Sequence, residues 1–184
     1  MRIVVAITGA TGACYGIRLL QVLKELKIES HLVISNWAKK TIELETPFSI
    51  ANVINLADFC YDEDNQAGAI SSGSFKHQGM VIVPCSMKTL GAIANGYASN
   101  LVHRGADVTL KEQRKLVLAV RETPLSSIHL ENMLKLARLG AVIMPPVPAF
   151  YNKPQTMEDL IDHFVGRVLD QLGVENNLYQ PWGT

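Results

Sequence analysis

The sequence predicts an α/β protein in which a doubly wound parallel sheet is the middle of three layers. The first observation is the apolar run "RIVVAI" at residues 2–7, which is typical of a parallel strand covered on both faces. The second is that such runs alternate five times with segments of helical periodicity. The third is the glycine-rich turn "TGATGACYG", which follows the first run directly. Together they favour a binding site at the carboxyl edge of the sheet.

The elements follow one another in a regular order. Apolar runs predict strands at residues 2–7, 29–35, 79–86, 115–124 and 141–150. Helical spacing predicts helices at 15–26, 36–46, 87–97, 100–114, 127–140 and 156–173, the last with Thr156 as its N-cap. Residues 48–78 are polar and irregular. We expect one Rossmann- or flavodoxin-like domain over residues 1–184, with a C-terminal tail from about residue 174.

Composition and charge exclude several classes of function. The 17 Lys and Arg residues balance the 17 Asp and Glu residues, so no overall field points to nucleic acid or an anionic membrane. No apolar run approaches the roughly 20 residues of a membrane span, and no signal peptide is expected before the first strand. Three scattered cysteines fit a cytoplasmic protein. Five dispersed histidines give no metal-binding pair, so no metal is expected.

Polar residues gather where the predicted strands end. Parallel strands present their carboxyl ends at one edge of a sheet, which is where ligands bind in open α/β folds. Five strand ends carry residues of this kind, at 8–12, 35, 84–89, 121–122 and 150–151. Their convergence on one rim predicts a site more strongly than any one of them does.

Two of these strand ends are turns suited to phosphate. The first turn offers the Thr8 and Thr11 hydroxyls and a helix N-terminus, where backbone N–H groups and the helix dipole favour an anion. The turn "PCSMKT" at 84–89 repeats the arrangement with Ser86 and Thr89. A tight turn that binds nothing and an ordinary N-cap are the respective alternatives. Two such turns on neighbouring strands favour a nucleotide lying across both.

Other candidate residues are ambiguous on their own. Arg121 in "VRETP" could clamp a phosphate, or could form a surface ion pair with Glu122. The turn "SSGS" at 71–74 is rich in hydroxyls, but taken alone it favours a plain surface loop. Glu45 near a helix end would usually be solvated, and Arg104 and Lys111 would form a solvated stripe on one helical face.

A short-chain dehydrogenase opens with a similar glycine turn, but two features argue against it. Such enzymes need a Tyr-x-x-x-Lys pair, and no tyrosine here has lysine four residues later. Ser35 ends the second predicted strand where an acidic residue would hold a ribose. A mononucleotide is therefore favoured over a dinucleotide.

Longer motifs carry a resemblance to a known family. The stretches "AITGATGACYGIRLL", "SSGSF", "VPCSMKTL", "RETPLSSIHLENM" and "PPVPAFYNKPQT" strongly resemble the UbiX-type flavin prenyltransferases, over essentially the whole chain. The similarity is greatest to the branch that accompanies phenolic-acid (hydroxyarylic-acid) decarboxylases and was formerly counted as a second component of those enzymes. The flavin-containing cysteine decarboxylases share the implied fold, but their P-x-M-N-x-x-M-W motif is not found in this sequence.

This resemblance implies a specific activity. The family joins the dimethylallyl group of dimethylallyl phosphate to N5 and then C6 of reduced FMN. The product, prenylated FMN, serves a UbiD-type aromatic acid decarboxylase. The resemblance also implies no metal and a homo-dodecamer with sites between subunits. Two alternatives stay open: a non-catalytic flavin-binding subunit, and direct decarboxylation of a phenolic acid.

The resemblance also assigns residues to roles. FMN is expected to contact Gly9, Ala10, Thr11, Ser35, Ser86, Met87, Lys88, Thr89 and Arg121. Dimethylallyl phosphate is expected to contact Tyr151, Arg167, Arg104, Lys111 and Trp182. The implied catalytic residues are Glu45, Glu122 and Lys111. Thr11 replaces a serine of many members, and "DNQAGAI" lacks a tryptophan that some relatives carry before the "SGS" turn.

The residue types that the resemblance assigns suit the chemistry of prenyl transfer. Fixed positive charges can stabilise a departing phosphate without a metal. Aromatic faces suit a developing allyl cation, and carboxylates can orient groups and move protons.

Overall fold

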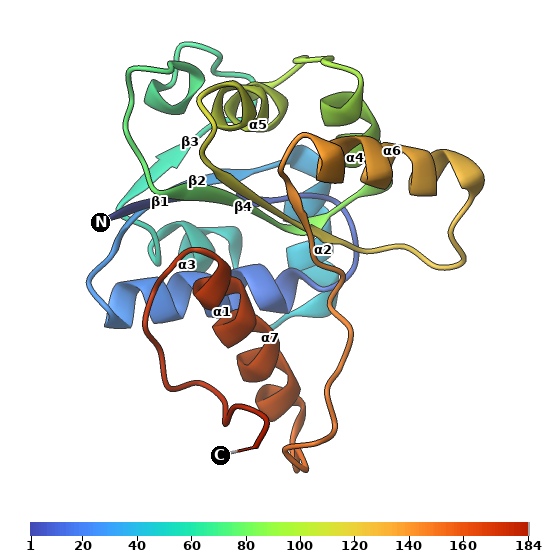
Figure 1. Ribbon diagram of the computed structural model, residues 1–184. Helices are drawn as coiled ribbons and strands as arrows, with labels where there is room; N and C mark the ends of the chain where they lie inside the picture. The colour runs from blue at the N-terminus through green and yellow to red at the C-terminus, as the bar shows by residue number, and fades with distance from the viewer. Residues whose placement is uncertain (184) are drawn as a thin grey trace.

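The computed structural model describes residues 1–183, which form a six-stranded parallel sheet with helices on both faces (Figure 1). The strand order is β3-β2-β1-β4-β5-β6, and every neighbouring pair is parallel. The strands are β1 (Arg2–Ile7), β2 (Glu29–Ile34), β3 (Phe59–Tyr61), β4 (Gly79–Cys85), β5 (Lys115–Val120) and β6 (Val142–Ile143). This order is that of the doubly wound dinucleotide-binding sheet, so the predicted fold class is confirmed.

The helices divide between the two faces of this sheet (Figure 1). One face is covered by α1 (Ala13–Glu25), α2 (Asn36–Glu45), α3 (Ile50–Ile54) and α7 (Met157–Gln171). The other is covered by α4 (Met87–Ala94), α5 (Leu101–Lys111) and α6 (Ser127–Arg138). The Thr156 side chain accepts from Asp159 N, which confirms the predicted cap of α7. No helix within residues 1–183 is long and apolar enough to cross a membrane.

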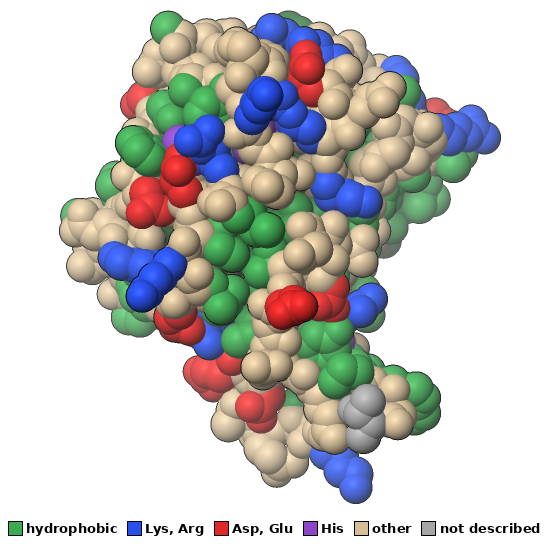
Figure 2. Space-filling view, turned by 60° about the vertical axis from the view of Figure 1, so that its left-hand side comes forward, with side chains coloured by type: hydrophobic (Ala, Val, Ile, Leu, Met, Phe, Trp, Pro, Cys, Tyr) green, Lys and Arg blue, Asp and Glu red, His purple; other side chains and the backbone are tan. Residues whose placement is uncertain are grey.

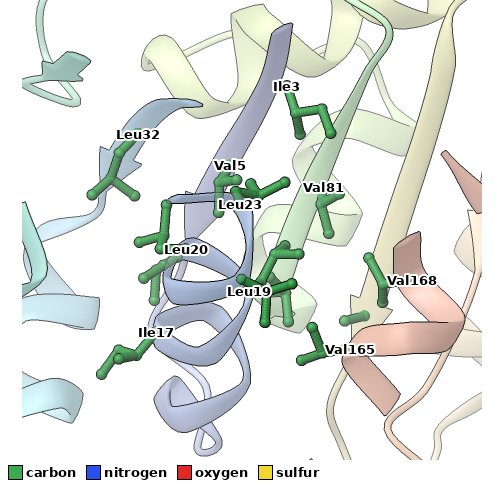
Figure 3. Close-up of a cluster of buried hydrophobic side chains, with 14 of the residues drawn as sticks. Ile3, Val5, Ile17, Leu19, Leu20, Leu23, Leu32, Val81, Val165 and Val168 are labelled. Atoms are coloured by element: carbon green, nitrogen blue, oxygen red, sulfur yellow. The ribbon is translucent and has the colours of Figure 1, made fainter. Parts of the chain in front are cut away.

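The core consists of one apolar layer on each face. Side chains of a strand point alternately to opposite faces. Accordingly, Ile3, Val5 and Ile7 of β1 pack with α1 and α7, whereas Val4 and Ala6 pack with α4 and α5. Figure 3 shows the first layer, in which leucines of α1 and valines of α7 meet the strands. These layers fix the height of the helices over the sheet and hence the positions of the turns that follow β1 and β4.

Three predictions of local structure were wrong. Residues 48–78 contain α3, the edge strand β3 and a 3₁₀ turn, Ala69–Ser71, so the sheet has six strands rather than five. The sequence did not predict β3 because it has only three residues, pairs within residues 1–183 only with β2, and is largely exposed.

The strand expected at 141–150 is reduced to Val142–Ile143. Prolines at 145, 146 and 148 follow it, and proline lacks the N–H that a ladder needs. The strand expected at 115–124 ends at Val120.

Candidate functional site

The three glycines of the first turn have three separate tasks. A Cβ on Gly9 would lie 2.5 Å from Trp37 Cβ, so glycine lets the start of α2 approach the turn. Gly12 has φ +99°, a left-handed conformation that favours glycine, and it precedes α1. A Cβ on Gly16 would lie 2.5 Å from the Val83 carbonyl oxygen, so this glycine sets the spacing between α1 and β4. The unusual spacing therefore follows from packing against two different neighbours.

The first turn is tied to the turn after β4. Thr8 Oγ1 donates to the Pro84 carbonyl at 2.8 Å and accepts from Ser86 N at 2.9 Å. Ser86 caps α4 by accepting from Thr89 N at 3.3 Å. Ser35 caps α2 by accepting from Ala38 N at 3.2 Å. Thr8 is thus a structural hydroxyl that joins the two turns, and Ser35 and Ser86 each cap a helix beside the same rim.

A cavity of about 150 Å³ lies between these turns. Its lining combines hydroxyls, an amide, one lysine and one carboxylate: Thr8, Gly9, Ser35, Trp37, Glu63, Ser86, Lys88, Thr89, Asn100 and His103. Burial and the Lys88 charge lower the pKa of His103, so the ring is neutral and Lys88 is the cation of this cavity. Hydroxyls, helix N-termini and one exposed ammonium suit a phosphate ester.

Glu63, which closes one side of this cavity, carries no local signal that would single it out in the sequence. Its buried carboxylate accepts from Asn36 N at 2.6 Å and from Asn100 Nδ2 at 3.1 Å. It therefore joins the first turns of α2 and α5, helices that carry expected site residues.

Glu45 is the last residue of α2 and reaches back to the glycine turn. Its Oε2 accepts from Gly12 N at 2.8 Å, so the exposed carboxylate is fixed rather than free in solvent. It also lines a second cavity of about 310 Å³ between α1, α7 and the chain after α2, where Arg18 donates to Asp162 at 2.6 Å. A carboxylate held this way can orient or relay a proton at the turn.

Arg121 and Glu122 follow β5 at the same rim. Arg121 N donates to the Cys85 carbonyl at 3.1 Å, and its guanidinium is exposed. Burial and the neighbouring Cys14 raise the pKa of Tyr15 in the first turn of α1, and the Arg121 charge opposes that rise. Within residues 1–183, Glu122 accepts only from the adjacent Thr123 N, at 2.9 Å, so Arg121 and Glu122 do not form the ion pair considered from the sequence.

Tyr151, Arg167 and Trp182 come together in the C-terminal part of the chain. The ring centroids of Tyr151 and Trp182 lie 5.3 Å apart at 90°. Arg167, on α7, donates to Asp170 at 3.1 Å and to the Tyr179 hydroxyl at 3.3 Å. This group forms a cluster of its own, and its members do not line the cavity between the turns.

Arg104 and Lys111 lie on α5, whose first turn borders the cavity, but neither side chain lines it. Arg104 donates to the Ser71 carbonyl at 3.2 Å and to Asp107 at 2.8 Å, and Lys111 pairs with Glu112. Arg114, which follows α5, donates to the Gly73 carbonyl at 2.6 Å, so the "SSGS" turn packs against the C-terminal end of α5. Lys111 stands about 15 Å along the helix from Asn100 at the rim. One copy of the chain therefore brings five of the residues expected to bind FMN around one cavity, but none of those expected to bind the prenyl phosphate; the five are Gly9, Ser35, Ser86, Lys88 and Thr89.

Charge is dispersed over the visible surface. In Figure 2, Lys and Arg side chains are interspersed with acidic and uncharged ones rather than gathered into one patch. Within residues 1–183, no three His, Cys, Asp or Glu side chains are grouped so that they could hold a metal ion.

Fold and rim together define a nucleotide-binding α/β protein, and residues 1–169 match the Flavoprotein family. The chain is 54% identical over 184 residues to flavin prenyltransferase UbiX of Methanocaldococcus jannaschii, covering 100% of both chains. A crystal structure of AnUbiX (PadA1) in complex with FMN and dimethylallyl pyrophosphate matches with TM-score 0.98 and 54% identity, covering 100% of this chain and 97% of that one. The chain belongs to the UbiX-like flavin prenyltransferases.

Two further structures place this family among its neighbours. The dodecameric FMN-dependent UbiX-like decarboxylase from Escherichia coli O157:H7 matches with TM-score 0.98 and 57% identity, each chain covered completely. Peptidyl-cysteine decarboxylase EpiD matches with TM-score 0.63 at 21% identity, over 80% of this chain and 82% of that one. The latter likeness concerns the fold alone and agrees with the predicted cysteine decarboxylase-like architecture.

Proposed function

We propose that this protein is a flavin prenyltransferase that transfers the dimethylallyl group of dimethylallyl phosphate to N5 and C6 of reduced FMN, with release of phosphate. The observation that carries this proposal is the 54% identity, over the whole chain, to a structure holding FMN and a dimethylallyl ester. The rim supports it independently, because two capped turns and one ammonium surround a cavity of about 150 Å³. That cavity suits the phosphate end of a mononucleotide.

The residues at the rim fit FMN. Gly9 exposes its backbone where any side chain would meet Trp37, and Ser35, Ser86 and Lys88 offer polar groups to the cavity. Reduced FMN supplies the nucleophilic ring atoms when bound. The Gly9–Thr11 turn, Ser35, the Ser86–Thr89 turn and Arg121 would bind and orient it. Glu45, fixed on Gly12 N at 2.8 Å, would hold or move a proton at that turn.

The prenyl donor would be bound by cations and aromatic rings. Arg167 and Tyr151 would hold its phosphate, and the adjoining face of Trp182 would border the five-carbon group. Arg104, Lys111 and Arg121 would add positive charge while the carbon–oxygen bond to phosphate breaks. Glu122 would orient groups or accept the proton that leaves when the second bond to the ring forms.

These two sets of residues meet only if several copies of the chain assemble, so we propose a homo-dodecamer with shared sites. Lys111 lies at the far end of α5 from the rim of its own chain. Exposed leucine and isoleucine side chains on α6, an apolar surface for association, include Ile128, Leu130 and Leu134. The 57% identical Escherichia coli protein is dodecameric. The product would be received by a UbiD-type decarboxylase acting on an aromatic acid.

Direct decarboxylation is the second candidate, because the 57% identical Escherichia coli structure is named a decarboxylase. A flavin-binding subunit without turnover is a third outcome of the same experiment. The purified chain is incubated without oxygen with reduced FMN and either dimethylallyl phosphate or the pyrophosphate. Flavin with one added five-carbon unit, together with equimolar phosphate or pyrophosphate, is expected. Carbon dioxide from a phenolic acid and FMN alone would favour decarboxylation, and flavin binding without either product would leave only the non-catalytic role.

A further inference from the structure

His163 of α7 lies between the two residues expected to hold the prenyl phosphate. Its Nε2 is 2.8 Å from the Tyr151 hydroxyl, and the two rings meet edge to face at 5.5 Å. On its other side the ring meets Tyr179 at 4.9 Å. His163 and Arg167 are four residues apart and so occupy one face of α7. A buried imidazole therefore touches both Tyr151 and the tyrosine that contacts Arg167.

The Arg167 side chain is held in place by a residue that follows α7. Tyr179 donates to Asp170 at 2.5 Å and accepts from Arg167 at 3.3 Å. A Cβ on Gly166 would lie 2.6 Å from the Tyr179 ring, so glycine permits this close seating. The guanidinium is thereby held through Nη1. Its other N–H groups donate to no group within residues 1–183, so they can bind an anion.

We propose that His163 is a positioning residue for the prenyl phosphate, donating Nε2–H to the Tyr151 oxygen so that the Tyr151 hydroxyl proton is free to bind that phosphate. A tyrosine hydroxyl has one proton. If Tyr151 gave it to His163, only lone pairs would face the anion. Burial and the Arg167 charge lower the pKa of His163, which keeps the ring neutral with a single N–H. The inference rests on the proposed prenyl transfer and adds to it a residue that the sequence did not suggest.

A double-mutant cycle tests this role. Dimethylallyl phosphate is titrated calorimetrically into the full-length assembly loaded with oxidised FMN, so that binding is measured without turnover. His163→Phe is expected to raise the Kd for dimethylallyl phosphate about fivefold to tenfold, the size of one hydrogen bond, with FMN affinity unchanged. In a Tyr151→Phe background the same change is expected to add less than about twofold, because the partner is already lost.

His163→Gln keeps a donor on a side chain of similar reach and should bind like wild type. His163→Asn is polar but too short, and it replaces the phenylalanine variant if that one fails to assemble. An equal loss from His163→Phe in both backgrounds, or a glutamine variant as weak as the asparagine one, would overturn the inference. Wild-type turnover measured alongside separates the two proposals. Turnover with no effect of His163 refutes the inference alone, whereas absence of both binding and turnover refutes prenyl transfer as well.

Discussion

Two positively charged groups at one end of the parallel sheet and one at the other end are used in opposite ways. At the carboxyl end, Lys88 and Arg121 are exposed and their side chains make no hydrogen bond or ion pair within residues 1–183. At the amino end, Arg2 pairs with Glu29 at 2.5 Å, and Glu29 also binds His31 at 2.7 Å. Lys88 and Arg121 are thus available to a ligand, whereas Arg2 is engaged in contacts within the chain.

The amino-end cluster is closed by aromatic rings. His31 stacks on Phe59 at 4.7 Å and binds the Tyr61 hydroxyl through Nδ1 at 2.8 Å. Arg2 lies 4.7 Å from the centre of the Phe75 ring. Because an ionised Glu29 can only accept, His31 Nε2 carries a proton in this pair. Arg2, Glu29, His31 and Tyr61 thus satisfy one another, which is the pattern of a stabilising cluster rather than a binding site.

The contrast predicts that substitutions at the carboxyl end reduce turnover and those at the amino end reduce stability. The largest effect is expected for Glu45→Gln. General acid–base catalysis contributes about 10²–10⁴-fold, so single-turnover prenyl transfer should slow by that factor. The amide oxygen can still accept from Gly12 N, so FMN affinity and the thermal unfolding midpoint should change little.

Glu43→Gln is the matched control, because Glu43 lies on the same helix and, among the described residues 1–183, forms only an exposed 3.6 Å pair with Lys40. It should turn over like wild type. If Glu45→Gln instead loses FMN affinity at an unchanged rate, the carboxylate only anchors the glycine turn. Wild-type rates for both variants would make Glu45 a surface charge.

The second prediction concerns His31, at the amino end. His31→Leu deprives the half-buried Tyr61 hydroxyl of its partner and removes one of the two partners of the Glu29 carboxylate, which Arg2 still holds. Each lost hydrogen bond costs about 0.5–1.5 kcal/mol. We expect the urea midpoint of unfolding to fall accordingly while FMN affinity and turnover stay as in wild type. A lost activity at unchanged stability would mean that the two ends are coupled and that the contrast is wrong.

The sequence predicts the turns at the carboxyl end of the sheet better than the contacts at its amino end, and the reason is physical. Each of the turns after β1 and β4 is formed by consecutive residues, such as Gly9 to Gly12, so its conformation can be predicted from the residue types within the turn. Glu63 has no such signal, because its partners Asn36 and Asn100 lie 27 and 37 residues away. The strand β3 could not be recognised within residues 48–78, because an exposed edge strand does not require an apolar pattern.

The prenyl-phosphate residues show a further limit of local patterns. Tyr151 and His163 are 12 residues apart and meet only because the chain folds back along α7. Family resemblance supplied Tyr151 and Arg167, but no pattern in the sequence distinguished His163 from a core histidine. Their assignment to the donor stays a prediction.

The smallest expected effect is a pH dependence at the amino end. Hydrogen bonds from Arg2 and His31 lower the pKa of Glu29 from 4.5 to about 2. A carboxyl whose pKa is lower in the folded chain stabilises the fold fully above pH 4.5, and this contribution is lost as the pH falls towards 2. Because about 35% of the Glu29 side chain is exposed, solvent screening limits the contribution to about 1 kcal/mol or less.

Glu29→Gln should therefore lower the urea midpoint at pH 6 and approach wild type at pH 2.5. Glu43→Gln, with its looser pair, should run parallel to wild type throughout. A difference between Glu29→Gln and wild type that persists unchanged at pH 2.5 would show that Glu29 acts through packing and not through its charge.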